Sequence, residues 1–181
     1  MAFVRAAARC LVLLLALAAP HIASAQAENP ELKQLRVLVE SGELERASSA
    51  VDAYVQAHPK DPRARFLKAV ILTHQNRIDD AIAIYTQLTY DYPELPEPYN
   101  NLAALYAQQG RYDAARDALQ RAIDAQPSYA TAHENLGDIY ARLAARSYAR
   151  ALELDAGRAE AQRKLKIVND LVPPAPPSGK P

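Results

Sequence analysis

The side chains that could bind a metal or act as acid and base are few and widely separated in this chain of 181 residues. Beyond residue 25 the histidines are His58, His74 and His133. A zinc site on a helix needs a second ligand one turn away, as when two histidines stand four residues apart. None of these histidines has another type of ligand at that spacing. The sequence therefore predicts neither a metal site nor a cofactor.

Four acidic side chains could form a cluster, namely Glu94, Glu97, Glu134 and Asp138. The simpler interpretation is that they lie on ordinary solvated faces of helices. The chain has no phosphate-binding glycine loop, no nucleophile motif and only five glycines in all. We therefore expect a protein without catalytic residues, which is not an enzyme.

Markers of chain reversal recur in the sequence every 34 residues. The markers form three sets, which are turn residues, small residues and prolines. A period of 34 residues is typical of an array of helix–turn–helix units. The three sets are Gly42, Asn76 and Gly110; Ala47, Ala81 and Ala115; Pro59, Pro93 and Pro127.

The unit with the clearest pattern covers residues 96–129. Pro96 is acceptable in the first turn of a helix, and Gly110 can adopt the positive φ that ends that helix. Pro127 then ends a second helix. Two apolar faces at helical spacing must pack together and against neighbouring units. These faces consist of Leu102, Ala103 and Tyr106 in the first helix, and Ala115, Leu119 and Ala122 in the second.

This pattern resembles the tetratricopeptide repeat (TPR) family over roughly residues 28–156. The resemblance implies an all-α, right-handed solenoid whose concave surface binds a protein or peptide, with no reaction. In bacterial envelopes, exported members often serve cell-wall, secretion, pilus or polysaccharide machinery. The family motif is matched by Tyr99, Leu102, Ala103, Tyr106, Gly110, Ala115, Leu119, Ala122 and Pro127.

The chain divides accordingly into repeats and flanking segments. We expect a terminal repeat first, two regular repeats, a degenerate fourth repeat, a capping helix and a disordered proline-rich tail. The respective ranges are 28–61, 62–95, 96–129, 130–156, 157–172 and 173–181.

The fourth repeat lacks five residues where its turn should be. The segment from Tyr140 to Tyr148 has no Gly, Pro, Asn or Asp, and its Ala, Arg and Leu favour helix. We therefore predict one continuous helix over about residues 129–155, about 40 Å long at 1.5 Å per residue. Its far half would pack on the 157–172 helix or on a second protein. The alternative is a kink at Ala144–Ala145 that preserves a short hairpin.

The first helix of each unit should line the concave surface. The family's best-known groove binds a peptide carboxylate, and only Asn101 matches that pattern here, so we predict no such clamp. We expect a groove that is apolar at Phe66 and Val70 and lined by amides and acids at the other end. Alternatively, the first unit covers Phe66 and Val70 as core. The predicted groove residues are Arg63, Phe66, Val70, Thr73, Glu97, Asn100, Asn101, Ala104, Ala107, Thr131, Glu134, Asn135, Asp138 and Ala141.

The N-terminus predicts export. Two arginines precede a short apolar run from Cys10 to Ala19, and a small-residue site ends at Ala25. These features are typical of a secretory signal peptide over residues 1–25, since the run is too short to span a membrane. A membrane anchor is the alternative. The processed chain has no cysteine, which favours a bacterial envelope and a periplasmic location.

Charge excludes two classes of partner. The chain has 21 basic and 21 acidic residues, and removal of Arg5 and Arg9 with the signal peptide leaves 19 against 21, a net charge of −2. A near-neutral chain does not suit nucleic acid or an anionic membrane surface. We therefore expect a periplasmic scaffold with a protein or peptide partner and no stable membrane insertion. The alternatives are a small-ligand-binding protein and a homo-oligomer formed through the fourth repeat.

Overall fold

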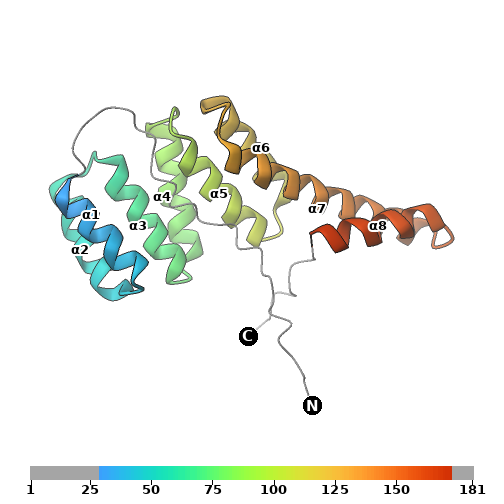
Figure 1. Cartoon of the computed structure of the whole chain (residues 1–181), viewed down its shortest axis with the longest axis horizontal. Coiled ribbons are helices and arrows are strands. Elements are labelled where there is room, and N and C mark those ends of the chain that lie inside the picture. The colour runs from blue at the N-terminus through green and yellow to red at the C-terminus, as the bar shows by residue number, and fades with distance from the viewer. Residues whose placement is uncertain (1–28, 173–181) are drawn as a thin grey trace, which may run out of the picture.

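The computed structural model describes residues 29–172, which form a row of packed helical hairpins (Figure 1). The predicted signal peptide and the proline-rich tail lie outside the described residues. No strand occurs in the described part, so the all-α solenoid is confirmed. The helices are α1 Pro30–Glu40, α2 Leu44–Ala57, α3 Pro62–His74, α4 Ile78–Asp91, α5 Pro96–Gln108, α6 Tyr112–Ala125, α7 Ala130–Leu154 and α8 Ala159–Leu171.

The turns inside the first three hairpins share one conformation. Gly42, Asn76 and Gly110 have φ of 76°, 60° and 72°, the left-handed region that ends a helix and reverses the chain. Asn is the residue that replaces glycine there most readily, because its short polar side chain tolerates this region. The period of 34 residues in the sequence is therefore a period in backbone conformation.

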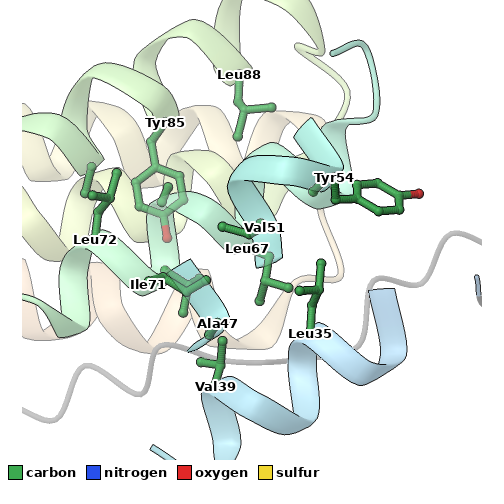
Figure 2. Packing of buried hydrophobic residues seen from close by; sticks show 14 of the residues in the cluster. Leu35, Val39, Ala47, Val51, Tyr54, Leu67, Ile71, Leu72, Tyr85 and Leu88 are labelled. Atoms are coloured by element: carbon green, nitrogen blue, oxygen red, sulfur yellow. The ribbon is translucent and has the colours of Figure 1, made fainter. Parts of the chain in front are cut away.

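Small residues allow the two helices of each hairpin to approach closely. Ala47, Ala81 and Ala115 are completely buried, and each lies at the same place in α2, α4 or α6. Two contiguous clusters of buried apolar side chains run along the row. One extends from α1 to α5 and is shown in Figure 2, and the other extends from α5 to α7. Because no hairpin has a core of its own, stability depends on stacking.

The fourth unit is not a hairpin. α7 runs without interruption from Ala130 to Leu154, so the alternative of a kink with chain reversal is wrong. Its first half packs on α6, and Arg146 in its middle bonds the Asp113 carboxylate of α6 at 2.8 Å. Its second half packs against α8, and the two helices extend together beyond the row (Figure 1). The missing turn is thus replaced by a helix shared between two packing partners.

None of the helices between residues 29 and 172 combines the length and the apolar character needed to cross a bilayer.

Candidate partner-binding surface

The residues predicted to line the groove lie on α3, α5 and α7, the first helices of their units. α1 contacts α3, and α5 contacts α7, so first helices adjoin one another at both ends of the row. The structure divides the predicted residues into two groups. Those at least partly exposed are Arg63, Phe66, Thr73, Glu97, Thr131, Glu134, Asp138 and Ala141, and those buried are Val70, Asn100, Asn101, Ala104, Ala107 and Asn135.

The buried amides form a chain of hydrogen bonds across three helices. Asn135 Nδ2 donates to Asn100 Oδ1 at 2.8 Å, and Asn100 Nδ2 donates to Asn101 Oδ1 at 3.4 Å. Asn101 Nδ2 in turn donates to the Tyr85 hydroxyl at 3.0 Å. A buried polar group needs such a partner, because each one left unpaired costs about 1–3 kcal/mol. This amide chain therefore joins α4, α5 and α7.

The amide chain corrects one part of the predicted groove. Asn100 and Asn101 are each only 1% exposed, so their amides serve the protein interior and do not face a partner. The sequence analysis did not identify Tyr85 of α4, whose hydroxyl is the last acceptor in this chain of amides. A buried tyrosine needs a hydrogen-bond partner for its hydroxyl, and this requirement could have indicated that a nearby amide is buried with it.

Tyr85 is the most deeply buried polar group of this region. Its side chain is fully inaccessible to solvent. Burial raises the pKa of Tyr85 far above its usual value, although hydrogen bonds with Asn101 and Thr73 act in the opposite direction. The hydroxyl therefore stays protonated at physiological pH and accepts the hydrogen bond from Asn101.

The predicted apolar end of the groove is also corrected. Val70 is 1% exposed and belongs to the same buried cluster as Leu35 and Val39 of α1. Phe66 is half-buried against this cluster, and its ring meets that of Tyr85 edge-on, with centroids 5.5 Å apart. The first unit covers Val70 because α1 and α2 both pack on α3. These two residues are therefore part of the packing between units.

Arg63 lies in the first turn of α3, where an ion pair with Asp61 fixes its side chain. Its Nε and Nη2 donate to the Asp61 carboxylate at 3.0 and 2.8 Å. Asp61 also accepts the Arg63 backbone N–H at 2.9 Å and so caps α3. Burial by itself would raise the pKa of Asp61, but the bonds from Arg63 outweigh it and lower that pKa. Arg63 thus stabilises the helix start.

Acidic side chains remain accessible at the α5–α7 end. Glu134 is exposed, and Glu97 and Asp138 are half-exposed. Burial raises the pKa of Asp138, the Arg142 charge lowers it, and the Glu134 charge adds to the rise. Asp138 is therefore a partly desolvated carboxyl beside a second carboxyl one helical turn away.

A buried tyrosine lies next to this acidic end. Tyr129 is mostly buried, and its hydroxyl has no hydrogen-bond partner in the described part of the chain. Burial, together with the Glu97 charge, raises the pKa of Tyr129 to about 12. The hydroxyl is itself buried, so it stays neutral beside Glu97 and is not presented to a partner.

In the described part of the chain, the surface of α5 and α7 presents carboxylates and holds no cluster of metal ligands. No group of three metal-ligating side chains occurs within residues 29–172. α5 and α7 present the carboxylates of Glu97, Glu134 and Asp138, and the bond between Asn135 and Asn100 joins the two helices. Such an arrangement can bind cationic groups and backbone N–H donors of a partner.

Comparison with known proteins identifies the repeat type. A family model described as "Tetratricopeptide repeat" matches residues 32–96, and one described as "TPR repeat" matches residues 104–143. Together the two matches cover more than half of the chain.

Curated relatives are similar over part of their length. The TPR repeat-containing thioredoxin TTL4 of Arabidopsis thaliana is 30% identical over 101 residues, which are 56% of this chain and 15% of that protein. Protein O-mannosyl-transferase TMTC1 of Homo sapiens is 30% identical over 99 residues, 52% of this chain and 11% of that protein. The chain therefore spans less than a sixth of either relative.

Solved structures share the fold. TTC0263, a thermophilic TPR protein of Thermus thermophilus, is 24% identical with a TM-score of 0.59, covering 80% of this chain and 82% of that chain. YrrB, a TPR protein with an unusual peptide-binding site, is 18% identical with a TM-score of 0.55, covering 78% of this chain and 76% of that chain. Repeat matches, helix order and shared fold lead to one conclusion: this chain belongs to the tetratricopeptide repeat family.

Proposed function

We propose that this protein is an exported, non-enzymatic scaffold that binds a protein or peptide partner and serves a bacterial envelope assembly. TPR proteins are generally scaffolds for protein interaction, and one structural neighbour, YrrB, has a peptide-binding site. The binding surface in this proposal is the α5–α7 end of the row. Its partner carries Lys or Arg side chains, because the accessible groups there are mainly carboxylates.

The observation that carries the proposal is the set of accessible acids on a fixed base. Glu134 and Asp138 stand four residues apart on α7, and Glu97 lies on α5. The side-chain amides of Asn135 and Asn100 bond α7 to α5 at 2.8 Å. The acids are therefore positioned before a partner arrives, which reduces the entropy lost on binding. The burial that raises the pKa of Asp138 also strengthens its attraction to a cation, since the local dielectric is lower.

Charge reversal on this surface tests the proposal. Glu134→Lys should weaken binding by about tenfold or more and change its salt dependence, because a cationic partner is then repelled. Glu134 is exposed, so the fold should survive the change. A partner captured from envelope extract with the wild-type protein would be purified, and its affinity for each variant measured by calorimetry.

A matched control separates this surface from general charge effects. Asp124→Lys makes the same change of charge at an exposed position on α6. It should leave the affinity unchanged. If Glu134→Lys binds as tightly as the wild type, or if Asp124→Lys is equally damaging, the partner does not use the α5–α7 surface.

Export makes a separate prediction about the N-terminus. The charged start, short apolar run and Ala-Ser-Ala site predict cleavage after Ala25, so that the exported protein begins at Gln26. Intact mass of protein from the periplasmic fraction should match residues 26–181, allowing for cyclisation of the N-terminal glutamine. An exported protein that retains residues 1–25 would contradict the prediction and indicate an anchor.

A further inference from the structure

The C-terminal hairpin, formed by the second half of α7 and by α8 over residues 144–171, carries three of the six large apolar side chains that are exposed in the described part of the chain. Ile167 and Leu171 of α8 are 54% and 74% exposed, and Leu154 at the end of α7 is similarly open. Between Ala159 and Leu171 only Ala161 is buried. A terminal helix that caps a solenoid normally presents a polar outer face. Here one side of α8 packs on α7, while Ile167 and Leu171 remain more than half exposed.

The opposite end of the row has a groove of complementary character. It lies between α1 and α2 and has a volume of about 840 Å³. Its charged lining consists of Glu31, Glu45 and Arg46, all of which are exposed. The apolar part of its lining consists of Leu35, Leu38, Ala50, Ala53, Tyr54 and Ala57.

We propose that the two ends bind each other between copies of this chain, with α8 of one molecule lying in the α1–α2 groove of the next. The dimensions agree, because α8 has 13 residues and the helices that wall the groove have 11 and 14. At 1.5 Å per residue, each of these helices is about 16–21 Å long. Ile167 and Leu171 stand four residues apart and supply the apolar contacts that a groove of this kind takes from a helix.

Charge favours this head-to-tail contact over pairing of two C-terminal hairpins. The hairpin from residue 144 to residue 171 has six basic and four acidic side chains, whereas residues 30–57 have three basic and five acidic ones. Two hairpins would bring net positive charge to net positive charge. A hairpin and an α1–α2 end bring opposite charges together, which favours both encounter and register.

The symmetry of the contact has a definite consequence. A head-to-tail contact joins two different surfaces, so each molecule keeps one free end of each kind. Such contacts generate a closed ring or an open chain of copies, whereas hairpin pairing stops at a dimer. The proposal goes beyond partner binding on the α5–α7 surface, because it uses only the two ends of the row.

Variants that block one end at a time test the proposal. Ile167→Gln with Leu171→Gln removes the apolar contacts of α8 without changing its charge. Ala53→Arg fills the groove from an exposed position on α2. Sedimentation of the purified wild-type protein should show concentration-dependent association that weakens as salt is raised. Either variant alone should associate at least about 30-fold more weakly, as expected when central contacts are lost.

Mixing the two blocked variants gives the sharpest result. Each retains one functional end, so the mixture should form a 1:1 dimer and nothing larger. Tyr90→Gln and Ala83→Arg are the matched controls, since both positions are exposed on α4, away from both ends. These controls should associate like the wild type, and circular dichroism should show every variant to be folded.

Three results would overturn the proposal. The first is a wild-type chain that stays monomeric up to about 100 μM, where a contact of micromolar affinity would be filled. The second is association that survives Ala53→Arg but not the α8 change, which indicates pairing of hairpins. The third is association that survives both changes, which places the contact elsewhere on the molecule.

Discussion

Tyr85→Ala is expected to lower the free energy of unfolding by about 3–5 kcal/mol, the range for removal of a buried aromatic side chain. Tyr85 is fully buried, its ring packs against Phe66, and its hydroxyl accepts the hydrogen bond from Asn101. The substitution leaves a cavity between α3, α4 and α5 and deprives the amide chain of its last acceptor. Urea denaturation followed by circular dichroism measures the change.

Tyr85→Phe separates the hydroxyl from the ring. The ring and its packing remain, but Asn101 Nδ2 loses the acceptor that lies at 3.0 Å. We expect a loss of about 1–3 kcal/mol, the cost of one buried unpaired polar group. Asn101→Ala in the Tyr85→Phe background should then cost less than in the wild type, because the two groups interact. Equal costs in both backgrounds would show that the hydrogen bond between Asn101 and Tyr85 does not contribute to stability.

Ala144→Pro is expected to destabilise the protein by about 3 kcal/mol and to reduce its helical content. Proline in the interior of a helix removes a hydrogen bond and clashes with the preceding turn. Position 144 lies near the middle of the 25-residue α7, where a turn would stand if the fourth repeat were regular. Thermal unfolding and circular dichroism give the two readouts. A variant as stable as the wild type would mean that the chain tolerates a break there.

The position of the proline is the control. Ala130 is the first residue of α7, and Pro62 and Pro96 occupy the corresponding place in α3 and α5. Ala130→Pro should therefore be nearly neutral, because the first helical position needs no N–H donor. Ala144→Gly should cost about 1 kcal/mol, the difference in helix propensity alone. The three variants together distinguish a broken helix from a general intolerance of substitution.

The sequence was most informative where local chemistry decides the structure. Gly42, Asn76 and Gly110 predicted the turns, because few residues adopt a positive φ without strain. The absence of such residues between Tyr140 and Tyr148 predicted one long helix, which the structure has as α7. In both cases the residues of a short segment determine its own backbone conformation.

The groove was harder to predict, because it depends on how neighbouring helices lie over one another. Helical spacing predicted that Val70 and Asn100 face the groove, but the structure buries both. Periodicity gives the direction of a side chain from its own helix axis, but not which side chain of another unit will cover it. Nothing in the spacing of Asn100 and Asn135 shows that one amide donates to the other. That contact depends on the stacking of α5 and α7.

The unbroken α7 also gives the molecule a mechanical property. Repeats joined by loops can shift independently, whereas a helix bends little without a proline or a similar break. α7 contains no proline between Ala130 and Leu154, and Arg146 ties its middle to Asp113. A displacement of α8 would therefore move α7 as a whole, including the near end where Asn135 bonds Asn100. Movement of the C-terminal hairpin would thus shift Glu134 and Asp138 of α7 relative to Glu97 of α5.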